Sequence, residues 1–278
     1  MRKLIAANFF RLRKDRFSWC VVGIIVVLSL GNVFNSAYEA MAAGGYVMSL
    51  DGYYFGQAPL IGSYLALLIS MFLGTEFSEG TIRNKLCIGY KRDEIFLSNF
   101  ISCVLATIVL TAVWMLTSAL LFGMIGTLEI EMEVSEFIGC IFVAMGFAVS
   151  FAALYTVIGS LSSNKPMTII YTFAVYIIFA MAASALYDRL CEPEISEIMT
   201  YNNYGAVVMQ ESAPNPLYLS GMIRTVCEVA LELLPNGQAL LLSEVAIEYP
   251  VRAILLSVVF TTVTLLVGSR LFRRKDIK

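Results

Sequence analysis

The chain has 278 residues, of which 59% are hydrophobic and 14% are charged. Its mean hydropathy is +0.78, whereas a typical soluble domain is about 45–50% apolar and about 25% charged. This composition excludes a soluble globular domain and indicates an integral membrane protein. Histidine is absent, which removes the commonest general base and metal ligand. The net charge is only −2, but basic and acidic residues are distributed unevenly along the chain.

Residues 1–16 predict a basic amphipathic helix. One helical stripe is formed by Ile5, Phe9, Leu12 and Arg16. Basic amphipathic helices with aromatic residues lie in the membrane interface. The alternative is the basic start of a signal peptide, with Ala40-Met41-Ala42 as a cleavage pattern. The long basic region and the spanning length of the apolar run favour a helix that is retained.

Six apolar segments predict membrane spans, because a helix needs about 20 mostly apolar residues to cross the hydrocarbon. The expected spans are 17–38, 58–75, 96–125, 136–161, 167–187 and 251–272. The prediction is therefore an all-α integral membrane protein with an interfacial segment at 1–16 and a six-span domain over 17–278. Its two main connections are a loop at 76–95 and a larger one at 188–250.

The lysines and arginines orient this topology. Sixteen of the 19 fall on one side: Arg2, Lys3, Arg11, Arg13, Lys14, Arg16, Arg83, Lys85, Lys91, Arg92, Lys165, Arg270, Arg273, Arg274, Lys275 and Lys278. Cytoplasmic loops carry the excess of basic residues, so both termini are predicted to be cytosolic. Acidic residues gather on the opposite side, among them Glu39, Asp51, Glu129, Glu131, Glu133 and Glu136.

The stretch Gly74–Arg92 joins the second and third spans. Ile82 and Leu86 share one helical face, with Arg83 and Lys85 off that face. The spacing predicts a short amphipathic helix on the membrane surface, with a plain cytosolic loop as the alternative. Glu76 precedes this helix, and two roles are open to it: pairing with a buried cation, or capping the helix at the interface. The cap is favoured.

The amino-acid sequence of this stretch also resembles that of a known family. The run Glu76-Phe77-Ser78-Glu79-Gly80-Thr81-Ile82-Arg83-Asn84-Lys85 resembles the first cytosolic loop of bacterial ABC-2 type transporter permeases. In that family the loop is the coupling helix, which docks on a separate ATP-hydrolysing subunit. The resemblance assigns coupling to Glu76, Ser78, Glu79, Gly80, Thr81, Ile82, Arg83, Asn84, Lys85 and Leu86. It also implies that the N-terminal helix touches the ATPase.

The loop 188–250 is expected to be external. Its first part, rich in proline and asparagine, looks disordered, and a helix follows at about Leu217–Leu234. Pro235-Asn236-Gly237 breaks that helix, and a second helical piece covers Gln238–Ile247. The break and Gln238 resemble a Leu-Pro-x-Gly-Gln motif of the same family, where two external helices cap or enter the outer leaflet. A helical hairpin without a transport role is the alternative.

Residue sets for catalysis are missing from the sequence. It contains no G-x-x-x-x-G-K-[ST] phosphate loop, no H-E-x-x-H and no G-x-S-x-G. Ionisable residues are nearly absent from the middles of the spans, which argues against a proton- or sodium-coupled transporter. Cys191 and Cys227 both fall in the external region. An oxidising setting would permit a disulfide there, although free thiols are favoured.

Two spans carry small or hydroxylated stripes. They are Ser63, Leu67 and Ser70 in the second span, and Thr168, Tyr171, Thr172 and Tyr176 in the fifth. Such stripes usually mark close helix packing, which is the favoured interpretation. The family resemblance implies a further role, because these two spans flank its translocation path.

The resemblance as a whole implies the membrane-spanning permease subunit of an ABC-2 type exporter in a bacterial cytoplasmic membrane. Two permease subunits, identical or paralogous, would pair in the lipid bilayer over two ABC ATP-binding subunits. ATP and Mg²⁺ would be held by those subunits, so no cofactor and no nucleic acid is expected on this chain. Drugs, antimicrobial peptides and lipids are substrates in the family. The alternative is a non-transporting sensor or immunity protein that binds a peptide through the external loop.

Overall fold

A computed structural model describes residues 1–42, 54–125, 132–201 and 207–276. The charged residues Asp51, Glu129, Glu131 and Lys278 lie outside these ranges. All statements below concern the described part of the chain.

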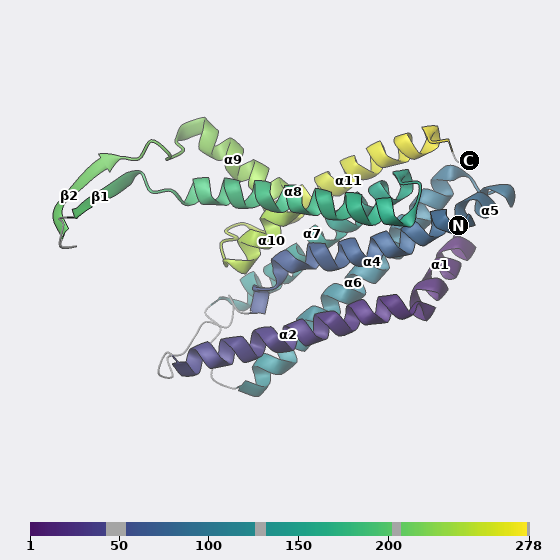
Figure 1. Cartoon of the computed structure of the whole chain (residues 1–278), viewed down its shortest axis with the longest axis horizontal. Helices are drawn as coiled ribbons and strands as arrows, with labels where there is room; N and C mark the ends of the chain where they lie inside the picture. Colours follow the sequence, from purple (N-terminus) through teal and green to yellow (C-terminus); the bar gives the residue numbers. More distant parts are fainter. Residues whose placement is uncertain (43–53, 126–131, 202–206, 277–278) are drawn as a thin grey trace.

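Six long helices form the body of the molecule (Figure 1). They are α2 (Arg16–Ala42), α4 (Ala58–Ser78), α6 (Arg92–Ile125), α7 (Val134–Leu161), α8 (Lys165–Cys191) and α11 (Pro250–Arg274). Each is long and apolar enough to cross a membrane, which confirms the six predicted spans and extends most of them by a few residues. The protein is therefore a multi-pass membrane protein. Both termini lie at the same end of the bundle, beside α1 (Arg2–Lys14) and α5 (Thr81–Cys87) (Figure 1).

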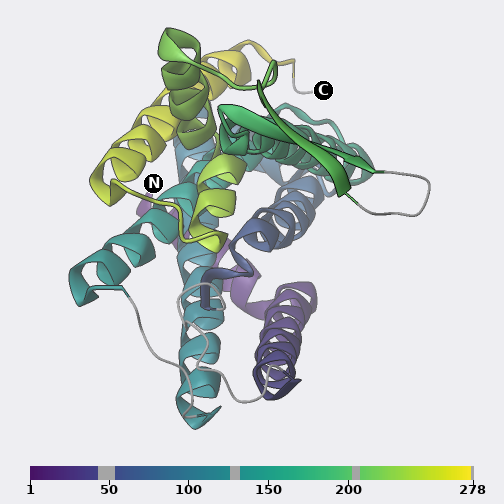
Figure 2. The same ribbon diagram turned by 90° about the vertical axis from the view of Figure 1, so that its left-hand side faces the viewer.

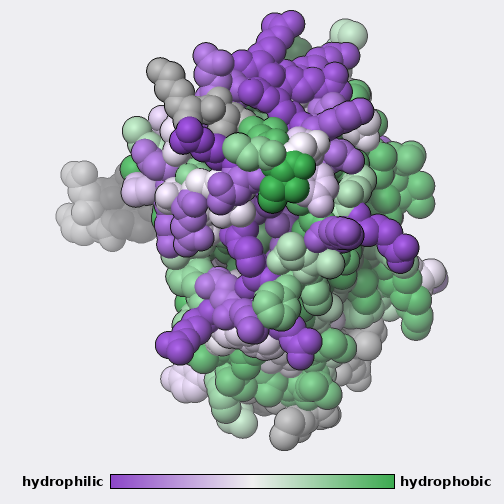
Figure 3. All heavy atoms as spheres, turned by 90° about the vertical axis from the view of Figure 1, so that its right-hand side faces the viewer, coloured by the Kyte–Doolittle hydropathy of each residue, from purple (hydrophilic) through white to green (hydrophobic). Residues whose placement is uncertain are grey.

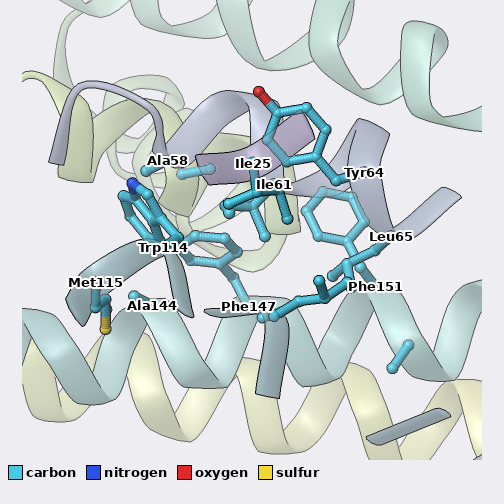
Figure 4. Close-up of a cluster of buried hydrophobic side chains, with 14 of the residues drawn as sticks. Ile25, Ala58, Ile61, Tyr64, Leu65, Trp114, Met115, Ala144, Phe147 and Phe151 are labelled. Carbon is cyan, nitrogen blue, oxygen red and sulfur yellow. The ribbon is translucent and has the colours of Figure 1, made fainter. Parts of the chain in front are cut away.

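The core lies where α4 and α7 meet (Figure 4). Ile61 and Leu65 of α4 pack with Phe147 and Phe151 of α7, and all four side chains are fully or almost fully buried. The Tyr155 hydroxyl donates to the carbonyl of Gly62 at 3.0 Å, so a polar contact also joins the two helices. The outer helices α8 and α11 have few buried residues, as expected of helices that face lipid.

Two polar side chains cap the first turns of helices and so determine where the chain changes direction. Asp15 separates α1 from α2, and its carboxylate accepts hydrogen bonds from the backbone N–H groups of Phe17 and Ser18 at 3.3 and 3.1 Å. Asn164 starts α8 in the same way, by accepting from the N–H of Met167 at 3.0 Å. Such side chains satisfy the free N–H groups of a first turn. They explain why α1 and α2 are separate helices at Asp15 and why the chain reverses at Asn164.

The region 188–250 contains more structure than predicted. Strands β1 (Ile195–Tyr201) and β2 (Val207–Pro214) pair antiparallel, with Ile195 opposite Pro214, where the sequence suggested disorder. The hairpin projects from the bundle end opposite the termini (Figures 1 and 2). Helices α9 (Gly221–Leu233) and α10 (Pro235–Ser243) follow and confirm the predicted pair. The predicted break at Pro235-Asn236-Gly237 is wrong: only Leu234 separates the helices, and these three residues form the first turn of α10, where proline is favoured. Cys191 and Cys227 are free thiols.

The end that carries the termini is hydrophilic. Figure 3 faces this end and shows polar side chains gathered over it. Exposed cations there include Arg2, Lys3, Arg83, Lys91 and Arg274. The bundle is therefore polarised along its long axis, with a basic end at α1 and α5 and the hairpin at the other end.

Candidate functional site

A buried carboxylate lies beneath α5. Glu76, near the end of α4, has no exposed surface. Arg11 Nη1 and Lys85 Nζ each lie 2.6 Å from its Oε1 atom. Asn99 Nδ2 donates to Oε2 at 2.8 Å. One side chain therefore joins four helices, α1, α4, α5 and α6.

A fifth side chain closes the network. Asn8 Nδ2 donates to Asn99 Oδ1 at 2.8 Å, and Lys85 Nζ donates to Asn8 Oδ1 at 3.1 Å. We call Asn8, Arg11, Glu76, Lys85 and Asn99 the Glu76 cluster. Burying a charge is unfavourable unless the charge is paired and hydrogen-bonded. Both oxygens of this carboxylate have partners, so the arrangement meets that condition.

The Glu76 cluster contains two cations for one carboxylate. Arg11 keeps 31% of its side chain exposed, whereas the Lys85 side chain is 10% exposed. The guanidinium of Arg11 also approaches Thr75 Oγ1 and the carbonyl of Phe72, at 3.4 and 3.3 Å. The second positive charge is thus partly solvated at the edge, and the Lys85–Glu76 pair forms the buried centre.

These contacts correct two sequence predictions. Glu76 does not cap α5: the N-cap position belongs to Gly80, and no side chain caps that helix. Lys85 does not belong to an exposed basic face, because its ammonium turns inward to Glu76. The physical reason is the same for both residues, since an unpaired carboxylate at the end of an apolar span is unfavourable and draws in the cation available nearby.

The face that α1 buries also differs from the stripe predicted from the sequence. Its buried residues are Leu4, Asn8 and Leu12, four apart, whereas Phe9 and Phe10 are about half exposed. Asn8 and Arg11 bring the polar side of the helix to Glu76. The aromatic side chains of Phe9 and Phe10 are thereby left on the outer side of the helix.

The two apolar residues of α5 attach it to the bundle. Ile82 is 2% exposed and packs with Phe96 and Phe272, and Leu86 lies against the same group. Ile82 and Leu86 therefore contact the spans. The remaining face of α5 is free: Arg83, Asn84, Cys87 and Ile88 are exposed. Ile88, with 75% exposure, was not singled out in the sequence.

The C-terminal end of α11 is held against the same region. Arg92 Nη1 binds the carbonyls of Arg273 at 2.8 Å and of Lys275, and Arg273 pairs with Asp93 at 2.6 Å. Lys275 Nζ binds the carbonyls of Ser160 and Ser162 at 3.1 and 2.5 Å. Burial lowers the pKa of this ammonium to about 8.

An open cavity of about 480 Å³ lies beside the start of α5, next to this C-terminal segment. Glu76, Ile82 and Arg83 line it on one side, and Ser163, Lys275 and Asp276 line it on the other. The cavity therefore borders α5, which is held on the bundle by the Glu76 cluster and by the packing of Ile82 on Phe272 of α11.

The Leu-Pro-x-Gly-Gln segment is a packing centre at the other end. Gln238 Nε2 binds the carbonyls of Glu232 and Ala253 at 2.6 and 2.9 Å, and its Oε1 accepts from Ser257 Oγ at 2.7 Å. A Cβ atom on Gly237 would lie 1.9 Å from the carbonyl oxygen of Leu231. Only glycine therefore allows α10 to pack this closely on α9.

The hydroxyl stripes lie in helix packing for the most part. Ser70, Thr168 and Thr172 are buried, and their hydroxyls bond carbonyls of their own helices. Tyr176 donates to the carbonyl of Pro59 at 3.0 Å and so joins α8 to α4. Ser63 and Leu67 are partly exposed, and Tyr171 is exposed. Most of the stripe residues therefore take part in packing within and between α4 and α8.

Comparisons with known proteins leave the family open. No family model matches the chain, and no curated protein matches it.

Proposed function

We propose that this chain is the membrane-spanning permease subunit of an ABC-2 type exporter. The sequence of Glu76–Lys85 resembles the coupling loop of that family, and α5 lies between the second and third spans, where such a helix is expected. The observation that carries the proposal is the Glu76 cluster. A helix of seven residues is firmly held by the spans and still presents one free face.

The free face of α5 would bind the ATP-binding subunit. Arg83 and Asn84 would supply polar contacts, and Ile88 would supply an apolar side chain that is exposed in this chain alone. Movement of that subunit would push α5. Because Lys85 is joined to Glu76 at 2.6 Å, displacement of α5 either moves α4 or breaks a buried ion pair.

The sequence indicates which subunit would bind and hydrolyse ATP. The chain has no phosphate loop, so ATP and Mg²⁺ would bind to the separate subunit, and this chain would not hydrolyse ATP. A second permease subunit, identical or paralogous, would complete the pathway in a bacterial cytoplasmic membrane, with both termini in the cytosol. The exported compound would be a drug, an antimicrobial peptide or a lipid.

Co-purification tests this function. The chain, extracted from its native membranes, should bring down an ATP-binding subunit with a phosphate loop. Arg83→Glu should weaken the association, because it reverses a charge on the free face of α5. Arg274→Glu is the matched control, since it reverses an exposed charge at the same end of the bundle without touching α5. Absence of any ATP-binding partner under conditions that preserve other membrane complexes would refute the proposal.

One observation favours the second candidate, a sensor or immunity protein. The β1–β2 hairpin projects from the bundle (Figure 1), and in the described region it has only two strands. Each strand thus offers an edge, and extended peptides bind proteins by adding a strand to such an edge. Removal of residues 195–214 separates the candidates, because it would abolish peptide binding by a sensor and leave association with an ATP-binding subunit intact.

A further inference from the structure

A long apolar groove lies on the side of the bundle near α1. It has a volume of about 300 Å³, and its walls come from four helices, α1, α2, α4 and α6. The apolar wall is built by Leu12, Val22, Leu68, Ala106, Leu110 and Val113. The lining of α6 extends from Leu105 to Val113, about 12 Å at 1.5 Å per residue. The shape is that of a slot parallel to a membrane-spanning helix.

The groove is polar only at its mouth. Arg13, Ser18 and Trp19 line the end at the α1–α2 junction. Trp19 Nε1 donates to the carbonyl of Arg13 at 2.9 Å, and the indole remains 62% exposed. Tryptophan is enriched at the membrane–water interface, where its ring meets both environments. The mouth therefore lies at headgroup level, and the slot extends from it into the hydrocarbon.

The mouth is strongly basic. Arg13 lines the mouth, and Lys14 and Arg16, its neighbours at the α1–α2 junction, are exposed. Asp15 is the single acidic residue among the first 20, and its carboxylate is occupied by the start of α2. Basic segments at a membrane surface attract anionic lipids. The charge of the mouth thus matches a lipid phosphate, and the slot matches an acyl chain.

We propose that this groove binds one anionic phospholipid, with an acyl chain in the slot and the phosphate at Arg13 and Arg16. The proposal does not depend on the transport function. It assigns the lipid a structural position as well, because a chain in the slot would contact both α1, which holds Arg11 on Glu76, and the spans α2, α4 and α6.

Native mass spectrometry of the purified full chain tests the site. The probes are phosphatidylglycerol and phosphatidylcholine with identical acyl chains. Phosphatidylglycerol should bind more tightly, and Arg13→Gln with Arg16→Gln should lower its affinity about fivefold for each charge removed. The pair Arg2→Gln, Lys3→Gln removes the same charge from the far end of α1 and should leave the affinity unchanged. Ala106→Phe, which fills the slot, should weaken both lipids.

Three results would overturn the proposal. The first is equal affinity for the two lipids. The second is an equal loss in the control pair, which would show a diffuse charge effect. The third is displacement of phosphatidylglycerol by the same concentration of glycerol 3-phosphate, which would show an anion site without a slot. Arg13 and Arg16 are exposed, so their variants should fold, and size-exclusion profiles verify this.

Discussion

Lys85 Nζ and Arg11 Nη1 both bind the same atom, Oε1 of the buried Glu76 carboxylate, at 2.6 Å. Arg11 lies 65 residues before Glu76, and Lys85 lies nine residues after it. Helix α1 and the short helix α5 are therefore held on α4 through one oxygen atom. The other oxygen holds α6 through Asn99.

Glu76→Gln should destabilise the protein, because it leaves the Lys85 ammonium buried without a countercharge. Removal of one partner from a buried pair typically lowers the free energy of unfolding by about 3–5 kcal/mol. The double variant Glu76→Gln, Lys85→Met should recover much of that loss, since it removes both charges. Unfolding in mixed micelles measures both variants. Equal stability of the single and double variants would mean that the pair is not coupled.

Arg83→Gln is the control for that experiment. Arg83 lies on the same short helix, and its side chain is exposed. Surface substitutions usually change stability by less than about 0.5 kcal/mol. A large effect at Arg83 would assign the destabilisation to α5 as a whole and not to the buried pair.

The sequence predicts the spans and fails at the Glu76 cluster for a definable reason. Runs of about 20 apolar residues are local signals, so the positions of α4 and α7 follow from the residues of each segment alone. The partners of Glu76 come from positions 8, 11, 85 and 99, and only packing brings them together. A usable signal is present in the sequence, because a carboxylate at the end of an apolar span needs a partner.

The sequence does not predict the β1–β2 hairpin. Proline and asparagine make its surroundings look disordered, but the pairing of Ile195 with Pro214 depends on backbone contacts between residues far apart in the chain. Residue composition does not report such pairing. The helical pair that follows is predicted, but its break is misplaced, because Pro235 begins α10 and proline fits the first turn of a helix.

Gly80→Val should displace α5. Gly80 has φ = +65° at the position preceding α5, and a β-branched residue is strained there. The expected loss of stability is about 1–2 kcal/mol, with weaker binding of an ATP-binding subunit. Gly80→Asn is the matched variant, because asparagine tolerates this conformation, and it should behave nearly as the wild type. Equal effects of valine and asparagine would contradict the backbone explanation.

Lys275 should make stability depend on pH. Its pKa is lowered from 10.5 to about 8 by burial, so between these values the folded state has released a proton that the unfolded state retains. The contribution of Lys275 to stability therefore rises with pH across this window and is lowest below about pH 8. The difference in unfolding free energy between the wild type and Lys275→Met should shift in favour of the wild type as pH rises.

Lys3→Met is the control for this pH series, since Lys3 is exposed and the variant should show no such shift. The opposite slope would be decisive against the prediction. It would mean that the carbonyls of Ser160 and Ser162 hold the ammonium in its charged form more strongly than burial opposes it.

Two native cysteines test the orientation of the bundle. Cys87 is exposed on α5, and Cys191 is exposed at the far end of α8. In sealed cells, a membrane-impermeant maleimide should label a variant that keeps only Cys191 and spare one that keeps only Cys87. Permeabilised cells should label both, which controls for reactivity. Labelling of Cys87 from outside would place α5 on the wrong side for an ATP-binding partner.

Site-specific photo-crosslinking from α5 tests the proposed function most directly. A photoreactive phenylalanine replaces Ile88, which is 75% exposed on the free face, or Ile223, which is 64% exposed on α9 and serves as the control. After irradiation of native membranes, position 88 should crosslink to a subunit with a phosphate loop, and position 223 should not. Crosslinking of position 88 to lipid alone, with full incorporation and normal yield, would contradict the assignment of α5 as a coupling helix.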